Sequence, residues 1–330
     1  MNILLTQHEC GLKDQFFPQD FLDELSKFGN LRVNDKGRTF THEELKEYVK
    51  DIDICMTHCW WGCPKFDEEV IENANRLKLI VHPAASVASF ITDCVYDRGI
   101  KVCSANSVMA RYVAEGTLAY ILSAIRQVPQ HDKFMKQKQW KQLKRSTLIN
   151  ARVGLVGLGT VGRFLLDFLK PFQVEVRIYD PYLSAQALMQ YDNVRLCSLE
   201  EVISWADVVS VHASRTPETY HMLNSERLGL MKDGAVLINT ARGALMDEAA
   251  LAAELKTGRI SAVLDVYDPE PPKPDNPLYE LDNVLLMPHV AGGDFSKEYS
   301  LAMLEEIKRF IKGEALLYEI PYEQFNRMTR

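Results

Sequence analysis

The segment VGLVGLGTVGRFL constrains the fold of this chain more than any other part of the sequence. Gly157, Gly159 and Gly162 form a G-x-G-x-x-G motif after an apolar run typical of a buried strand and ahead of a helical pattern. In that context the first glycine permits a tight turn, the second lets the backbone approach a pyrophosphate, and the third allows close packing of helix on strand. The amides of Thr160 and Val161 are expected at the helix N-terminus, facing the phosphates. The motif therefore predicts a dinucleotide-binding domain.

The dinucleotide is expected to be NAD, because Asp180 ends the next strand pattern in RIYDPY. A carboxylate at this position accepts hydrogen bonds from the adenosine ribose and repels a 2′-phosphate, which disfavours NADP. Arg177 lies earlier on the same strand and is less well placed to hold a phosphate. FAD is an alternative, although FAD proteins usually carry this motif near the N-terminus. A glycine turn beside a surface aspartate, with no cofactor, is the other alternative.

Two series of apolar runs alternate with helical patterns. From residue 152 onward the runs are RVGLVG, EVRIYD, DVVSVHA, GAVLINT, ISAVLDVY and NVLLMPH, and they predict six parallel strands of a complete doubly wound sheet. Before them, NILLT, IDICM, LKLIVH and IKVCS predict further strands, separated by patterns such as THEELKEYVK, where Thr41 is expected to cap a helix. Such alternation is typical of parallel sheets with crossover helices. The fold class is therefore α/β, with two Rossmann-like or flavodoxin-like doubly wound parallel-sheet domains.

A long helical region separates the two series, roughly over residues 112–144 with a break near Pro129. After the second series, YSLAMLEEIKRFIKG predicts an amphipathic helix, and the tail that follows has no strand partner of its own. This tail is expected to return to the first domain. We therefore expect an NAD domain at residues 105–297, inserted in a substrate domain made of residues 1–104 and 298–330.

Composition and charge disfavour several classes of partner. The formal net charge is −7, whereas nucleic acid and anionic membrane surfaces call for a basic face. No apolar run approaches the roughly 20 residues needed to span a bilayer, and MNILLTQHECG is typical of a buried strand and not of a signal peptide. We therefore expect a cytoplasmic protein without a nucleic-acid or membrane partner.

The seven cysteines predict reduced thiols, because their number is odd and they are scattered along the chain. Cys55, Cys59 and Cys63 are evenly spaced, with His58 among them, which raises the question of a zinc site. A glycine and a proline interrupt any helix there, and no second ligand pair follows at metal-like spacing. The sequence therefore predicts no metal site.

Three polar residues lie just beyond predicted strands of the second series: Arg242 in INTARGALMDE, Glu270 in LDVYDPEP and His289 in LLMPHVAGG. The carboxyl ends of parallel strands meet at one edge of a sheet, where ligands bind in open α/β folds. Singly, each residue could be a turn cap, a solvated acid or a loop histidine. Together they predict one catalytic site, with Glu270 and His289 in contact as an acid/base pair.

The chain resembles the D-isomer-specific 2-hydroxyacid dehydrogenase family over nearly its whole length. The segments GLGTVG, YDPY, TPETYHMLN, LMKDGAVLINTARGALMDE, LDVYDPEP and NVLLMPHVAGG occur in the family's order and spacing. The resemblance implies that Arg242 binds the substrate carboxylate and carbonyl, and that His289 donates a proton to the carbonyl oxygen. It also implies that Glu270 pairs with this histidine and that Asp265 binds the nicotinamide carboxamide.

The chemistry of reducing a 2-oxo acid suits these residue types. Hydride arrives at C2 while negative charge grows on the oxygen, so an acid must supply a proton and a cation must hold the substrate. Histidine, with an ordinary pKa near neutrality, suits the first task, and the planar fork of arginine suits the second. Five more residues after predicted strands complete the predicted NAD site: His212, Thr216, Thr240, Ala241 and Gly292.

The substrate loop of the first domain departs from the family pattern. The family carries G-x-G-x-D there, whereas this chain has HPAASVASF, with Ala84 and Ser86 in the glycine positions. The amides of Ala85, Ser86 and Val87 are still expected to bind the substrate, because a backbone donor needs no particular side chain.

A second loop, MTHCWWGCPKF, occupies the place where phosphoglycerate-type members of the family present basic side chains. His58 and Trp60 are predicted to contact the substrate, with Trp60 and Trp61 as an apolar lid over a larger side chain. Alternatively, the tryptophans belong to the core or to an interface. A dianionic phosphate would need more positive charge than this loop offers, which disfavours 3-phosphoglycerate.

These observations predict an NAD-dependent D-2-hydroxyacid dehydrogenase, or 2-oxoacid reductase, acting on a small 2-oxo or 2-hydroxy acid. The resemblance implies a homodimer built on the NAD domain, with residues 112–147 as the contact. The identity of the acid and the physiological direction stay open. Two alternatives also stay open: oxidation of another small acid such as formate or phosphite, and an NAD-sensing interaction protein on the same scaffold.

Overall fold

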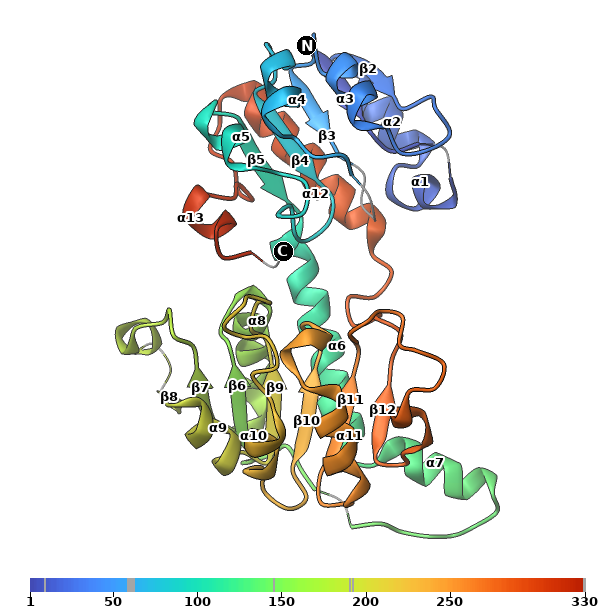
Figure 1. Cartoon of the computed structure of the whole chain (residues 1–330), viewed down its shortest axis with the longest axis vertical. Coiled ribbons are helices and arrows are strands. Elements are labelled where there is room, and N and C mark those ends of the chain that lie inside the picture. Colours follow the sequence, from blue (N-terminus) through green and yellow to red (C-terminus); the bar gives the residue numbers. More distant parts are fainter. Residues whose placement is uncertain (9, 58–62, 145, 190, 192, 329–330) are drawn as a thin grey trace. The chain divides into compact units, whose positions relative to one another are not determined.

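The computed structural model describes residues 1–8, 10–57, 63–144, 146–189, 191 and 193–328. The chain divides into two compact units. The first comprises Met1–Met109 and Asp294–Arg330, and the second comprises Ala110–Gly293. Each unit contains a parallel sheet with helices (Figure 1), which confirms the predicted α/β class with two doubly wound parallel-sheet domains.

The first unit is built on a five-stranded parallel sheet in the order β2-β1-β3-β4-β5. Its strands are β1 (Asn2–Leu5), β2 (Asn30–Val33), β3 (Ile54–Met56), β4 (Leu79–His82) and β5 (Lys101–Ser104). This strand order is the flavodoxin-like one. The apolar runs of the sequence predict four of these strands but not β2, an edge strand whose sequence NLRV mixes polar and apolar residues.

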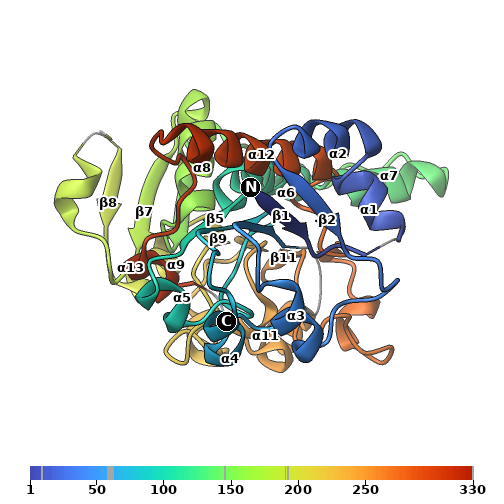
Figure 2. The ribbon, with the colours of Figure 1, turned by 90° about the horizontal axis from the view of Figure 1, so that it is seen from above.

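Helices cover both faces of this sheet (Figure 2). One face carries α1 (Gly11–Phe16), α2 (Gln19–Ser26) and α12 (Ser296–Lys312), and the other carries α3 (His42–Tyr48), α4 (Glu68–Asn73) and α5 (Asp93–Asp97); α13 (Tyr322–Phe325) follows α12. The core beneath α3, α4 and α5 includes Leu4, Ile80 and Val102. Thr41 caps α3 as predicted, because its hydroxyl accepts from the amide of Glu44 while the Glu44 carboxylate accepts from the amide of Thr41.

Glu306 of α12 holds the C-terminal segment to the first unit. This glutamate is fully buried, and its carboxylate accepts hydrogen bonds from the backbone amides of Leu317 (2.9 Å) and Tyr318 (3.0 Å). The thiol of Cys103 in β5 donates to the same carboxylate at 3.5 Å, and the pKa of this thiol is raised by burial and by Glu306. Further along, the amide of Ile320 donates to a β5 carbonyl at 2.8 Å. The segment after α12 is thus anchored to both α12 and β5.

The second unit is built on a seven-stranded parallel sheet in the order β12-β11-β10-β9-β6-β7-β8 (Figure 1). Its strands are β6 (Arg152–Val156), β7 (Glu175–Tyr179), β8 (Val194–Leu196), β9 (Val208–Val211), β10 (Val236–Asn239), β11 (Ser261–Leu264) and β12 (Val284–Leu286). Its helices are α6 (Asn106–Ile125, which begins in the first unit), α7 (Val128–Lys136), α8 (Thr160–Leu169), α9 (Leu199–Trp205), α10 (Ser225–Gly229) and α11 (Glu248–Lys256). Four short 3-10 turns are η1 (Lys170–Phe172), η2 (Ala185–Leu188), η3 (Gly243–Leu245) and η4 (Pro277–Glu280). The six predicted strands are present, and β8 is an additional edge strand.

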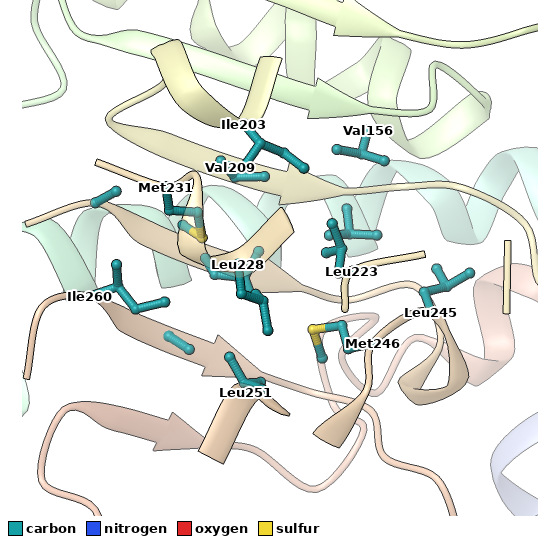
Figure 3. Packing of buried hydrophobic residues seen from close by; sticks show 14 of the residues in the cluster. Val156, Ile203, Val209, Leu223, Leu228, Met231, Leu245, Met246, Leu251 and Ile260 are labelled. Carbon is teal, nitrogen blue, oxygen red and sulfur yellow. The ribbon is translucent and has the colours of Figure 1, made fainter. Parts of the chain in front are cut away.

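Alternate residues of the central strands pack on opposite faces of this sheet, as the two-residue period of a strand requires. In β10, Leu237 belongs to the core beneath α9, α10 and α11, whereas Ile238 belongs to the core beneath α6 and α8. Figure 3 shows the first of these cores, in which Val209 of β9 lies in one cluster with Leu228 and Leu251 from the helices. Because helices cover both faces, the ends of the strands are the part of this sheet that a ligand can reach.

The helix α6 corrects the expectation that no part of the sequence is long and apolar enough to span a bilayer. Among the described residues it is the one helix that is long and apolar enough, by length and composition, to cross a membrane. Ala114, Ile121 and Ile125 on this helix are buried in a core of the second unit. Part of α6 thus packs as a core helix does.

Candidate active site

The glycine turn after β6 has a geometry suited to a bound dinucleotide. Gly157 has a φ of +92°, and a Cβ on it would lie 2.7 Å from the backbone nitrogen of Ala213. A Cβ on Gly162 would lie 3.1 Å from the carbonyl oxygen of Gly157, so α8 packs close to the turn. Around Gly159 the nearest atom to such a Cβ is 4.0 Å away, which leaves room for an approaching group. These are the three environments that the predicted roles of the glycines require.

The start of α8 and the end of β7 flank this turn. α8 begins at Thr160, and its N-cap residue is a glycine with no side chain to bond the first amides, including that of Val161. Such amides, together with the helix dipole, attract an anion. Asp180, directly after β7, accepts hydrogen bonds from the amides of Leu158 and Tyr182, both at 2.9 Å. A carboxylate has about four lone-pair sites, so capacity is left for ribose hydroxyls.

After β9, His212 lies against the glycine turn. Its Nε2 lies 2.9 Å from the hydroxyl oxygen of Ser210, and burial lowers the pKa of His212 to about 4. The imidazole is therefore neutral at physiological pH. Thr216 follows in a turn where its amide donates to the hydroxyl of Thr219 at 2.8 Å. This loop offers hydrogen-bonding groups near the turn, but the histidine adds no positive charge.

Arg242 follows β10 in a turn that Asn239 builds. The buried Asn239 side chain accepts from the amide of Ala241 at 3.0 Å and donates to the carbonyl of Arg242 at 2.9 Å. A Cβ on the next residue, Gly243, would lie 2.0 Å from the backbone carbonyl carbon of Tyr267. Only a glycine lets this turn lie so close to the segment that follows β11.

The guanidinium of Arg242 is partly buried and donates to the carbonyl of Ala241 at 2.6 Å. Burial lowers the pKa of Arg242, Glu270 opposes this shift by attraction, and Arg215 adds to it by repulsion. Arg215 follows β9, the strand beside β10. Thr240 is buried, and its hydroxyl oxygen lies 2.9 Å from a hydroxyl oxygen of α6. The charges of Arg215, Arg242 and Glu270 therefore influence one another at this end of the sheet.

Glu270 and His289 meet beyond the ends of the neighbouring strands β11 and β12. The Nδ1 atom of His289 lies 2.6 Å from the Oε1 atom of Glu270. With the carboxylate ionised, Nδ1 carries the proton of this contact, which leaves Nε2 for a ligand. His289 has a left-handed backbone with a φ of +56°, and its side chain is 48% exposed, compared with 27% for that of Glu270. The imidazole is therefore accessible while its partner is partly screened from water.

Asp265, directly after β11, lies against the loop that carries His289. It is 1% exposed, and its carboxylate accepts from the backbone amides of Val290 (2.9 Å) and Ala291 (3.0 Å). The phenol of Tyr120 on α6 donates to the same carboxylate at 3.2 Å. Sequence reasoning missed Tyr120, because a phenol within an apolar helical pattern carries no chemical signal. The carboxylate predicted to bind a cofactor thus also holds the backbone just before Gly292.

The predicted substrate loop belongs to the first unit and follows β4. Val87 is buried, and its carbonyl accepts from the amides of Phe90 and Ile91. Ala85 and Ser86 are partly buried. The carbonyl of Val87 is therefore used within the turn. The groups predicted to contact a substrate are different ones, the backbone amides of Ala85, Ser86 and Val87.

The two other predicted substrate contacts, His58 and Trp60, lie outside the described residues. Within the described ranges, one group of side chains could hold a metal ion by its geometry: His42, Glu43 and Glu69. The ammonium of Lys46 pairs with both of these glutamates, at 3.2 Å and 2.9 Å. These ion pairs give the exposed carboxylates a partner of their own.

Known proteins resemble this chain in sequence and in structure. Residues 118–291 match the family model described as D-isomer specific 2-hydroxyacid dehydrogenase, NAD binding domain. The chain is 32% identical over 320 residues to a D-3-phosphoglycerate dehydrogenase from Methanocaldococcus jannaschii, a match that covers 94% of this chain but only 60% of that protein. It is 34% identical over 285 residues to a glyoxylate reductase from Thermofilum pendens, with 83% of each chain covered. A solved structure of D-lactate dehydrogenase from Aquifex aeolicus, complexed with NAD and lactic acid, is similar with a TM-score of 0.71 and 26% identity, covering 95% of this chain and 96% of that one.

Proposed function

Because the chain belongs to the D-isomer specific 2-hydroxyacid dehydrogenase family, we propose that it is an NAD-dependent oxidoreductase acting on the CH–OH group of a small 2-hydroxy acid. In the reverse direction it reduces the corresponding 2-oxo acid. The observation that carries the proposal is the 2.6 Å contact between Glu270 and His289, with Arg242 after the next strand of the sheet. An acid/base pair near a guanidinium is what hydride exchange at C2 of such an acid needs.

The second unit has residues that fit NAD. Gly159, Thr160 and Val161 would bind the pyrophosphate through the open turn and the first amides of α8, and Asp180 would bind the adenosine ribose. The negative charge of Asp180 favours NAD over NADP. Loop residues after β9 to β12 would line the rest of the cofactor site: His212, Thr216, Thr240, Ala241, Asp265 and Gly292. When bound there, the nicotinamide supplies or accepts the hydride.

The three catalytic side chains would have different roles in binding the acid and transferring its proton. Arg242 would hold the carboxylate and the C2 oxygen of the acid with its planar fork, and its partial burial strengthens these charged hydrogen bonds. In the reducing direction, His289 would donate a proton from Nε2 to the C2 oxygen. Glu270 bonds Nδ1, so it fixes the imidazole orientation and stabilises the imidazolium that oxidation of the alcohol forms.

The proposal is tested by following NADH oxidation with a panel of 2-oxo acids that includes glyoxylate, pyruvate, hydroxypyruvate, 2-oxoglutarate and phenylpyruvate. We expect turnover of at least one acid, lost in Arg242→Ala and in His289→Ala while both variants still bind NADH. Arg195→Ala, which removes an exposed arginine of the edge strand β8, is the matched control and should behave as the wild type.

Two outcomes would contradict the proposal. Turnover of formate or phosphite, and of no 2-oxo acid, would assign the alternative small-acid substrates. Tight binding of NADH without turnover on the whole panel would favour an NAD-sensing interaction protein on this scaffold.

We further propose that the chain forms a homodimer built on the NAD domain, with residues 112–147 as the contact. Three large apolar side chains of this region are more than half exposed: Val128, Met135 and Trp140. Large apolar side chains exposed along one segment of a chain are typical of contacts between subunits. Light scattering should give twice the mass of one chain, and Trp140→Ala should shift the equilibrium toward the monomer. A wild type that is monomeric at micromolar concentration contradicts this assignment.

We also propose a cytoplasmic location. Six cysteines within the described ranges are free thiols: Cys10, Cys55, Cys63, Cys94, Cys103 and Cys197. Free thiols are typical of proteins in a reducing compartment. Fractionation of cells that express the tagged full chain would test this location, and recovery with the membranes would contradict it.

A further inference from the structure

Tyr120 of α6 connects this helix to the loop that carries the proposed proton donor. We propose that Tyr120 is a positioning residue: through the carboxylate of Asp265 it holds the backbone at Val290 and Ala291, and so sets the direction of the His289 imidazole. The inference rests on the proposed function, in which His289 exchanges a proton with the C2 oxygen. Tyr120 itself touches no reacting atom.

The link between Asp265 and the histidine loop is direct. The two amides bound by the carboxylate, at 2.9 Å and 3.0 Å, belong to Val290 and Ala291, the two residues that follow His289. His289 has a left-handed backbone with a φ of +56°, a conformation that needs support in a residue with a side chain. Fixing two consecutive amides after this residue removes most of the freedom with which its backbone could rotate.

The link between Tyr120 and Asp265 keeps this carboxylate in place. Asp265 is buried, and a buried carboxylate is costly unless donors surround it. The hydroxyl of Tyr120 donates at 3.2 Å, to the oxygen that also accepts the amide of Val290. Burial, followed by the charge of Asp265, raises the pKa of Tyr120, so the phenol keeps its proton and acts as a donor. The second phenol nearby, Tyr267, donates to backbone carbonyls instead, at 3.0 Å and 3.1 Å.

The same face of α6 also touches the loop through its backbone. Gly116 precedes Tyr120 by one helical turn, so both lie on one face of α6. A Cβ on Gly116 would lie 2.3 Å from the carbonyl oxygen of Ala291, which means that the loop rests against the helix at this point. Two contacts on one helical face therefore fix the loop, one by close approach and one through the Tyr120–Asp265 hydrogen bond.

Loss of the Tyr120 contact should affect proton transfer by His289 more than binding of NADH. Loss of the phenol should loosen the loop and misdirect Nε2 of His289, which lowers kcat. The proposed pyrophosphate and adenosine contacts follow β6 and β7, on the other side of β9 and β10, and should be unaffected. Because Asp265 and Gly292 belong to the proposed cofactor site, binding of NADH should also weaken, but by a smaller factor than kcat, since its pyrophosphate and adenosine contacts remain in place.

The test uses Tyr120→Phe in the purified full chain, with Tyr279→Phe, a half-exposed tyrosine of the segment after β11, as the matched control. Loss of one hydrogen bond to a buried charge should lower kcat about five- to tenfold in Tyr120→Phe, while the dissociation constant of NADH, which also depends on the remote pyrophosphate and adenosine contacts, should rise by a smaller factor. Hydrogen exchange of the amides of Val290 and Ala291 should accelerate in the same variant. Tyr279→Phe should match the wild type in all three measurements.

A second variant covers the case in which Tyr120→Phe folds poorly. Gly116→Ala displaces the loop but leaves the phenol in place, so it should lower kcat and accelerate the same exchange. Wild-type kcat and wild-type exchange in the folded variants overturn the inference. If the wild type binds NADH and turns over no 2-oxo acid, the proposed function fails, but exchange at Val290 and Ala291 still decides whether Tyr120 holds the loop.

Discussion

The carboxylate of Asp180 accepts a hydrogen bond from the amide of Leu158 at 2.9 Å, so the acid that follows β7 is joined to the glycine turn that follows β6. The same charge disfavours a 2′-phosphate on the proposed adenosine ribose. Asp180→Asn keeps an acceptor for the Leu158 amide but removes the charge. We expect the ratio of kcat/KM for NADH to that for NADPH to fall about 100-fold, since opposed like charges cost several kcal/mol. An unchanged ratio would show that Asp180 does not set the choice of cofactor.

Replacing Glu270 by glutamine should separate geometry from charge in the acid/base pair. The glutamine oxygen can still accept from Nδ1 of His289, but it no longer stabilises an imidazolium. We expect kcat to fall about 100-fold, the scale of general acid/base catalysis, with little change in the dissociation constant of NADH. Glu280→Gln, an exposed acid of the same segment, is the control. Equal rates in the two variants would remove Glu270 from the mechanism.

The two arginines at this end of the sheet should differ in their effects. Arg242→Lys loses the planar fork, and we expect kcat/KM for the acid to fall on the order of 100-fold. Arg215→Gln removes an exposed positive charge near Arg242, so an anionic acid is attracted less strongly and its KM should rise about two- to threefold. Added salt should shrink the second effect and leave the first. A larger loss of kcat/KM in Arg215→Gln than in Arg242→Lys would show that Arg215, and not Arg242, is the main contact to the acid.

The stability of the second unit should depend on pH through His212. Burial lowers the pKa of His212 to about 4 in the folded state, while the unfolded side chain titrates near its ordinary value of 6.5. Between these values the unfolded state binds the proton and the folded state does not, so stability falls as the pH drops from 6.5 toward 4. The loss is at most about 3 kcal/mol. Denaturant unfolding at pH 7.5 and pH 5 should show a smaller loss for His212→Asn than for the wild type, and equal losses would contradict the assignment.

Removing Glu306 should destabilise the first unit. Glu306→Ala leaves the amides of Leu317 and Tyr318 without their buried acceptor, and we expect the free energy of unfolding to fall about 3 kcal/mol. The neighbouring Glu305 is exposed, so Glu305→Ala should change it by less than about 0.5 kcal/mol. Thermal and denaturant unfolding of both variants provide the measurement. A similar small change in both would mean that the C-terminal segment is held by other contacts.

The sequence predicts most of the fold because the buried strands of a parallel sheet are continuous apolar runs. The strands that it misses, β2 and β8, lie at sheet edges and have sequences, NLRV and VRL, that mix polar and apolar residues, whereas the other edge strands, β5 and β12, keep a recognisable apolar run. The sequence pattern also understates how apolar α6 is, because this becomes clear only when the full length of the helix from Asn106 to Ile125 is known.

The sequence likewise predicts only part of the candidate site. The positions of Arg242, Glu270 and His289 could be predicted because each lies in the segment that follows a strand, and parallel strands align their ends. Tyr120 could not, because its partner Asp265 lies 145 positions away and the pairing depends on how α6 packs on the sheet. Charged or titratable side chains at strand ends can be recognised in a sequence, whereas contacts made through tertiary packing cannot.

The anchoring of the C-terminal segment by Glu306 has a consequence for biosynthesis. During translation, β4 and β5 leave the ribosome long before α12 and the segment around Ile320, so the face of these two strands that α12 covers stays exposed while the second unit can already fold. The nascent chain therefore passes through a stage at which chaperones would find a binding surface, and that surface disappears only when α12 and the segment after it emerge.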